Sequence, residues 1–407
     1  YPRHGGRDAA TFDLTFTAPK ELKLISVGDL QHSESKGVMT TSRWLTKGAI
    51  RNAAFNIGYY NPHEIQDFGM VPITVLAIED NRGDLDQEVS DDVVGSFKLF
   101  RQQFGQVQAD RLYVTETPFP HGLAFPGMLH LSWSGTLDLS PRGYEAVFRA
   151  HEVAHQWWGI DVDFTSYHDQ WLSEGLATYC GLLFLETEQD GFERYIDLLR
   201  IWKKHIIEIS DGPSRGGRQA GPLWLGYRNS SAIMGINYST IVYQKGAWVF
   251  HMLRSYMRDL DTGSDGRFLA GLREYYDKYR GKQASTSDFQ QIMEEHAGSD
   301  LGWFFNQWVY GAEIPTYLFS YRVEQVAGNR YVVHCKVGQG NVPREFQMAV
   351  PITIESEDGM RTTVRVPIQG VGAQFELPAV RSKPKKILFN DMESVLCRVE
   401  QVPWYRF

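Results

Sequence analysis

The fold of this chain is most constrained by the motif HEVAH at residues 151–155, together with Glu174 downstream. Apolar residues recur with a helical period from about 140 to 158, and this pattern predicts a helix that Gly159 ends. Positions i and i+4 of a helix share one face, so both imidazoles point the same way. Glu174 falls on a second predicted helix, with eighteen residues between it and His155. The fold must bring these two helices together.

Two histidines and one carboxylate are a ligand set for hydrolytic zinc. His151, His155 and Glu174 would fill three positions and leave a fourth open, whereas structural zinc usually takes four protein ligands, often cysteines. Cys180 lies near Glu174 in sequence, but we do not assign it as a ligand. Glu152 adjoins the first ligand and is placed to act as the base for a zinc-activated water. The pattern predicts metal-assisted hydrolysis with one zinc ion per chain.

An isolated HExxH motif can also be an ordinary polar helix face, so the distal Glu174 carries much of the argument. Endopeptidases with a third histidine need the longer spacing HExxHxxGxxH. Position 158 is Trp and position 161 is Asp, which excludes that class.

Length and patterning predict an α+β multidomain fold, because 407 residues are too many for one ordinary core. Residues 1–70 alternate as strands, residues 71–312 mix strands with helices, and residues 313–407 read as a small antiparallel β-sandwich. Further helices are predicted near 190–210, 240–259, 265–279 and 286–297.

Composition limits the classes of binding partner that we expect and the roles that the cysteines can have. The net charge of -8 argues against nucleic acid, and no apolar run reaches the roughly 20 residues that a membrane helix needs. Cys180, Cys335 and Cys397 form no CxxC pair or disulfide framework. We expect three buried or half-buried thiols, and a Cys335–Cys397 bridge stays open.

Three segments carry a family resemblance. HEVAHQWWG followed by WLSEGLATY is similar to the gluzincin aminopeptidases, the family of membrane alanyl aminopeptidase. FDLTFTAPK resembles the late part of that family's N-terminal β-domain, and TIVYQKGAWVFHMLR resembles its catalytic-tyrosine segment. The resemblance implies that residues 1–70 end an N-terminal β-domain and that residues 71–312 form a thermolysin-like zinc peptidase domain. It also implies a short, bacterial-type member without the helical C-terminal domain of larger relatives.

The resemblance also assigns roles around the substrate. It implies that Tyr243 donates to the tetrahedral oxyanion, with Tyr238 as a second candidate. Relatives grip the substrate's free amine with a Gly-x-Met-Glu-Asn segment upstream of HExxH. Here that stretch contains Gly122, Ala124 and Gly127, and matching Gly127 places Ala124 where the glutamate should be. Its backbone can still pair with an extended peptide as an added strand.

The chain departs from the family at two acidic positions. The amine-binding glutamate is missing at Ala124, and Glu116, eight residues earlier, is a candidate substitute. In many relatives an acid seven residues after the third ligand braces a zinc ligand, but here that position is Gly181. Another group must therefore orient His151 or His155.

These residues predict a zinc metallopeptidase that acts on peptides, and we favour an aminopeptidase with relaxed amine recognition. Open alternatives are an endopeptidase, a hydrolase of a non-peptide substrate such as an epoxide, and a catalytically weak zinc-binding relative. Arg215, Arg218 and Arg228 lie in a long Gly-, Pro- and Ser-rich loop. We expect solvated charges there, and contact with a substrate carboxylate is the alternative.

Overall fold

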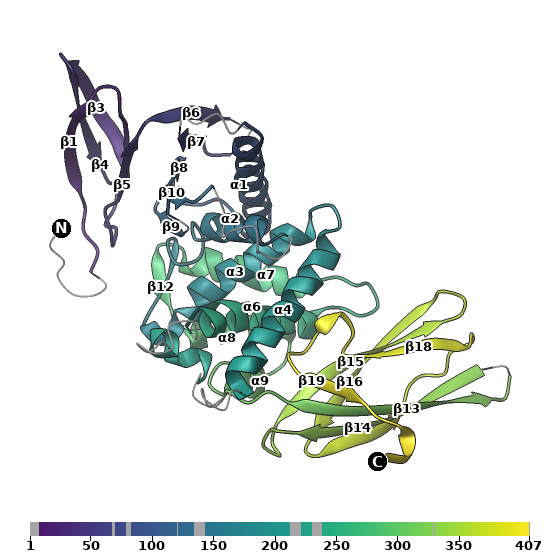
Figure 1. Ribbon diagram of the computed structural model, residues 1–407. Helices are drawn as coiled ribbons and strands as arrows, with labels where there is room; N and C mark the ends of the chain where they lie inside the picture. The colour runs from purple at the N-terminus through teal and green to yellow at the C-terminus, as the bar shows by residue number, and fades with distance from the viewer. Residues whose placement is uncertain are drawn as a thin grey trace. The chain divides into compact units, whose positions relative to one another are not determined.

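The computed structural model describes residues 8–66, 70–78, 83–119, 121–133, 143–211, 221–229, 238–328 and 330–406. Arg215, Arg218 and the predicted start of the motif helix near 140 lie outside these residues. The described chain contains strands near both ends and helices between them, which confirms a mixed fold of helices and strands (Figure 1). None of its helices is both long enough and apolar enough to span a bilayer.

The chain divides into two compact units, each assembled from several segments. The first contains residues 1–164, 180–194 and 276–284, and the second contains residues 165–179, 195–275 and 285–407. These units are not three consecutive domains, so the division at residues 70 and 312 stays a prediction.

The first unit begins with small antiparallel sheets. Strands β1 (Asp13–Pro19), β4 (Met39–Leu45) and β3 (Asp29–Lys36) pair in that order, and β2 (Lys23–Ser26) pairs with β5 (Phe55–Gly58). Exposed and covered positions alternate along β1, as the period-2 pattern from Phe12 predicts.

A five-stranded sheet lies in the same unit, in the order β6-β7-β8-β10-β9. β7, β8 and β10 run parallel, while β6 and β9 are antiparallel edge strands. The buried run ITVLAI suits β7, because an interior strand is covered on both faces. The bounds are β6 (Tyr60–Ile65), β7 (Ile73–Ile78), β8 (Leu112–Glu116), β9 (Gly122–Phe125) and β10 (Met128–Leu131).

Helices α1 (Gly83–Phe104) and α2 (Tyr144–Ala154) also belong to this unit. Three phenylalanines of α1 are almost completely buried, and the rings of Phe97 and Phe100 pack against Trp157, just after α2. Arg149 of α2 is 2% exposed and forms ion pairs with Glu88 and Asp92 of α1. Aromatic packing and a buried charge therefore both fix the helix that carries the motif. After α2 in the chain, strand β11 (Val162–Phe164) pairs in parallel with β12 (Lys282–Ala284).

The second unit is built around helices with an aromatic core. The rings of Trp171 and Phe250 stack 4.9 Å apart between centroids, and Phe289 packs edge-on against Phe250 at 5.6 Å. Its α-helices, some shared with the first unit, are α3 (Trp171–Glu186), α4 (Gly191–Asp211), α6 (Gly246–Met257), α7 (Gly266–Tyr279), α8 (Thr286–Ala297) and α9 (Gly302–Trp308). The π-helix η4 (Ser239–Lys245) directly precedes α6. The short 3-10 turns are η1 (Tyr167–Asp169), η3 (Leu223–Asn229), η5 (Asp391–Glu393) and η6 (Trp404–Arg406).

The C-terminal segment of the second unit forms two sheets, in the orders β17-β14-β13-β19 and β16-β15-β18. Cys180, Cys335 and Cys397 are all buried and free, so the expected thiols are confirmed and the Cys335–Cys397 bridge is not formed. The strands are β13 (Thr316–Val326), β14 (Arg330–Gly340), β15 (Gln347–Ser356), β16 (Arg361–Gln369), β17 (Gly372–Glu376), β18 (Pro384–Phe389) and β19 (Arg398–Gln401).

Candidate metal centre

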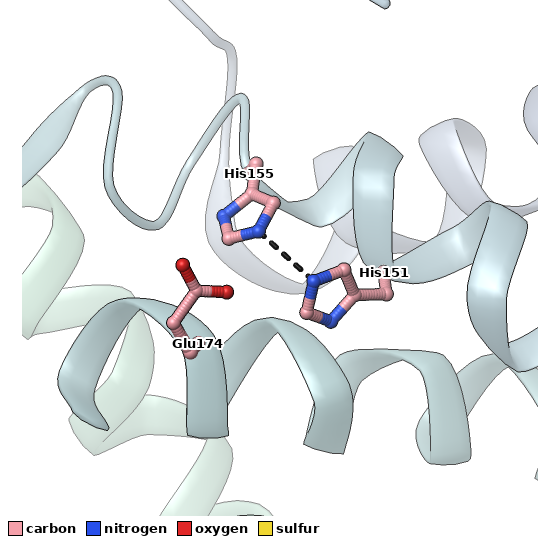
Figure 2. Close-up of side chains that lie close together, drawn as sticks. All are labelled: His151, His155 and Glu174. Carbon is pink, nitrogen blue, oxygen red and sulfur yellow. Dashed lines mark hydrogen bonds between the residues drawn. The ribbon is translucent and has the colours of Figure 1, made fainter. Parts of the chain in front are cut away.

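The structure brings the three predicted ligands together. One ligand atom from each of His151, His155 and Glu174 lies within 4.8 Å of the other two. The His151 imidazole projects from the last turn of α2, the His155 imidazole from the residue that caps this helix, and the Glu174 carboxylate from the first turn of α3, facing both rings (Figure 2). The Nε2 atoms of the two histidines are 3.0 Å apart. Two nitrogens and an oxygen converging at this range can hold a divalent metal ion.

The protonation of His155 fits a metal ligand. Its Nδ1 lies 2.9 Å from the carbonyl oxygen of Trp158. A carbonyl only accepts hydrogen bonds, so Nδ1 is the donor, and in the neutral imidazole with this tautomer the lone pair is on Nε2. That lone pair is on the nitrogen facing His151, where a metal would bind. The Trp158 carbonyl therefore orients His155, a task that a carboxylate performs in many metal sites.

Helix packing explains why position 181 carries no bracing acid. A Cβ atom on Gly181 would lie 2.5 Å from the backbone oxygen of Val147 in α2. Real side chains do not approach backbone atoms so closely, so α2 and α3 can meet here only at a glycine. The close contact that joins the two ligand-bearing helices thus excludes an acid at Gly181, and the turn after α2 supplies the brace for His155 instead.

Glu152 lies against the edge strand β9. Its side chain is buried, and a Cβ atom on Gly122 would lie 2.3 Å from its Oε1 atom. Gly122 is therefore a glycine because the carboxylate occupies the space beside its Cα. The contact places the predicted base next to the backbone of the predicted substrate strand.

The sheet register fixes which way Ala124 points. Gly122 pairs with Leu131 and Ala124 pairs with Leu129, so these four residues share one face of the sheet. This is the face of α2, because the Cβ direction of Gly122 meets Glu152. The methyl group of Ala124, where the family resemblance implies an amine-binding glutamate, therefore lies on this face.

Glu116 does not replace that glutamate, and the prediction that it folds back is wrong. Its Oε2 accepts a hydrogen bond of 2.8 Å from the backbone amide of Ile78 at the end of β7. In the sheet order, β7 lies on one side of β8 while β10 and β9 lie on the other. The Glu116 carboxylate is therefore held away from β9.

Tyr238 and Tyr243 lie together at the π-helix η4. Their ring centroids are 5.6 Å apart, and the Tyr238 hydroxyl accepts a 2.5 Å hydrogen bond from Gln170 Nε2. Burial, and then the nearby charge of Glu174, raise the pKa of both phenols above the ordinary value. Both hydroxyls stay protonated at neutral pH and can donate hydrogen bonds. Runs of π-helix often occur at functional sites.

A glycine contact brings Tyr243 and Glu174 together. A Cβ atom on Gly175 would lie 2.9 Å from the Cα of Gly246, and the reverse distance is the same. The backbones of α3 and α6 therefore touch beside Glu174 and just after Tyr243. Any side chain at either glycine would push the ligand and the tyrosine apart.

Arg228 is exposed, and its guanidinium lies 4.7 Å from the centre of the Tyr167 ring. This agrees with the expected solvated charge. Contact with a substrate carboxylate remains an untested alternative.

Two imidazoles one helical turn apart, a carboxylate on a second helix and a buried glutamate beside them are the arrangement of the gluzincin class of metalloproteins. Comparison with known proteins agrees. Residues 142–308 match the peptidase family M1 domain.

Curated relatives match part of the chain. Aminopeptidase M1-B of Oryza sativa subsp. japonica is 29% identical over 164 residues, which are 40% of this chain and 17% of that protein. Puromycin-sensitive aminopeptidase of Caenorhabditis elegans is 26% identical over 226 residues, 54% of this chain and 22% of that protein. The matched region is therefore about a fifth of these relatives.

The fold resembles a solved structure over nearly its whole length. Legionella pneumophila aminopeptidase A, in complex with aspartic acid, matches with a TM-score of 0.71 at 17% identity. The match covers 96% of this chain and 45% of that structure.

Proposed function

We propose that this chain is a zinc metallopeptidase that hydrolyses peptide bonds, and that it acts mainly as an aminopeptidase. The observation that carries the proposal is the contact of Glu152 with β9 at Gly122, beside the grouped His151, His155 and Glu174. The predicted base therefore lies beside the metal-ligand group. It also contacts an edge strand that can bind a peptide backbone. The names of the relatives support the same activity.

The architecture proposed with this function has three parts. Residues 1–70 would be the end of an N-terminal β-domain, residues 71–312 a thermolysin-like catalytic domain and residues 313–407 a β-sandwich. The five-stranded sheet with α1 and α2, the helices around Trp171 and the two C-terminal sheets support it.

The substrate would bind along β9. This strand ends the order of its sheet and pairs with β10 on one side. An extended peptide can add to the other side through backbone hydrogen bonds. Because Gly122 has no side chain, the peptide backbone can approach the Glu152 carboxylate.

Each catalytic step has a residue in reach. A bound zinc ion would polarise the scissile carbonyl and activate water. Glu152 would accept the water's proton and pass it to the leaving amine. Tyr243 would donate its hydroxyl proton in a hydrogen bond to the developing oxyanion. Gln170 fixes the hydroxyl of Tyr238, the second candidate donor.

The tyrosine assignment predicts a defect in turnover. We expect Tyr243→Phe to lower kcat by roughly 100- to 1,000-fold with little change in KM, because the hydroxyl acts on charge that develops in the transition state. Steady-state kinetics on one peptide would measure both constants, with Tyr238→Phe as the matched control. A rise in KM at normal kcat would show that Tyr243 only binds substrate. A larger kcat loss in Tyr238→Phe would move the role to that residue.

Ala124 predicts relaxed recognition of the substrate's amine. One peptide, compared with its N-terminus free and acetylated, should show a modest preference in kcat/KM. Ala124→Glu should increase that preference roughly 10- to 100-fold, because a charge-assisted hydrogen bond contributes about 1.5–3 kcal/mol. Ala124→Gln is the matched control, since it has similar size without the charge.

The outcomes separate the alternatives. Strict rejection of the acetylated peptide by the unmodified protein would show that another acid binds the amine. Equal cleavage of both peptides would assign an endopeptidase, which the Ala124 methyl group favours as second candidate. Cleavage of neither, with zinc bound, would indicate a catalytically weak relative.

A further inference from the structure

Gln156 directly follows the second histidine of the motif and is almost completely buried, with 2% exposed. Its side-chain amide forms two hydrogen bonds with the hairpin that joins β9 to β10. Oε1 accepts from the backbone amide of Gly127 at 2.9 Å, and Nε2 donates to the carbonyl of Phe125 at 3.0 Å. Both polar atoms of the Gln156 side-chain amide therefore contact the same turn.

The chemistry of this contact requires a primary amide. The turn presents one donor and one acceptor, and a side-chain amide supplies the complement of both without a charge. A carboxylate would accept from Gly127 but would face the Phe125 carbonyl with no proton to donate. A thioether of the same length would leave both backbone groups without these partners.

Gln156 adds to a first contact between β9 and the segment formed by α2 and the turn after it. The first is Glu152, whose carboxylate lies against Gly122 at the start of the strand. Gln156 follows four residues later and contacts Phe125 at the strand's end. The motif segment therefore spans β9 from its first residue to its last, with the predicted base at one end and this amide at the other.

These contacts matter because β9 is an edge strand. Strand pairing holds it only through β10 within the described part of the sheet. Ladder hydrogen bonds fix register along the strand, but an edge strand can still tilt or twist about its single neighbour. The contact with Gln156 fixes the end of β9 that is farther from Glu152.

We propose that Gln156 is a positioning residue, which sets the distance and tilt of β9 relative to α2. A peptide backbone bound along β9 is thereby placed beside the Glu152 carboxylate. The proposal rests on the proposed function, in which β9 binds the substrate. It predicts that Gln156 matters more as more of the peptide lies along β9.

The test compares a short substrate with a long one. Gln156→Met keeps the shape and removes both hydrogen bonds, while Gln156→Glu keeps the acceptor and removes the donor. We expect kcat/KM for an extended peptide to fall about tenfold or more in either variant, through KM more than kcat, since two buried hydrogen bonds are lost or disturbed. For a single-residue arylamide with the same first residue, the fall should be several times smaller.

Two readouts do not depend on turnover. Zinc content should stay at the unmodified protein's level in both variants. Calorimetry with an extended peptide analogue, in which a methylene-amine linkage replaces the scissile amide, should show the same tenfold loss of affinity.

Gln307 provides a matched control elsewhere in the chain. Its Nε2 donates to the carbonyl of Gln347 at 2.9 Å, and its Oε1 accepts from the amide of Gln347 at 2.9 Å. Gln307→Met therefore removes the same pair of hydrogen bonds to a strand backbone. It should lower the unfolding temperature without changing the ratio of peptide to arylamide kcat/KM.

Three results would overturn the proposal: unchanged peptide kinetics in Gln156→Met, equal losses on both substrates, or loss of zinc. Hydrolysis of neither substrate by the unmodified protein would reject the proposed peptidase function instead. The analogue titration would then still decide whether Gln156 governs peptide binding.

Discussion

Glu152→Gln is expected to lower kcat by roughly 100- to 10,000-fold, the usual contribution of a general base, while zinc and fold are retained. The amide has nearly the same shape, so the contact with Gly122 can persist. It cannot accept a proton from water at neutral pH. Steady-state turnover of a peptide, zinc content and the unfolding temperature would together measure the effect.

Glu116→Gln is the control for this substitution. Glu116 is also a buried glutamate, but its carboxylate accepts from the amide of Ile78 in β7 rather than facing the site. The same chemical change there should affect stability, with turnover within a few-fold of the unmodified protein. Near-normal turnover in Glu152→Gln would exclude it as the base, and an equal loss in both variants would indicate a general effect of changing a buried carboxylate.

Local geometry made the metal-ligand group predictable from sequence. The spacing of His151 and His155 places them on one helix face whatever the rest of the chain does. The predicted helix that carries Glu174 is found as α3. The predicted helices at 265–279 and 286–297 are found as α7 and α8, because their apolar residues keep a helical period. Bringing Glu174 onto the histidines needed the tertiary fold, which only the family resemblance implied.

Backbone partners and helix contacts could not be predicted. The brace on His155 is the carbonyl of Trp158, and a backbone group has no signature in the sequence. Gly181 was recognised as a departure from the family, but its cause is the approach of Val147 in another helix. Gln156 was missed because its partners, Phe125 and Gly127, lie about thirty residues earlier in the chain.

Sheet register and helix type account for two further differences between the predictions from sequence and the structure. Glu116 was expected near Ala124 from sequence distance alone, whereas strand order places its carboxylate on the β7 side of β8. The helix predicted at 240–259 begins instead as the π-helix η4, which holds Tyr243, before continuing as α6. A π-helix widens the turn by one residue, and apolar periodicity does not distinguish this from ordinary helix.

The metal site gives the other prediction with a large effect. The unmodified protein should hold one zinc ion per chain. His151→Ala, His155→Ala and Glu174→Ala should each abolish stoichiometric zinc after dialysis, because two remaining protein ligands cannot hold zinc tightly without a third. Metal analysis of the dialysed proteins and competition with a chelator of known affinity would measure the loss.

The control uses a histidine of the neighbouring sheet. His130 pairs with Leu123, so it lies on the face of the sheet opposite Gly122 and α2. His130→Ala should keep full zinc, and no second group of three ligands was found within the residues that the structure describes. Full zinc in any one of the three ligand variants would contradict the assignment of that residue. Zinc loss in His130→Ala as well would mean that binding depends on the integrity of the sheet. If the three ligand variants lose zinc but keep their unfolding transitions, the metal serves chemistry rather than folding, as an open three-ligand site predicts.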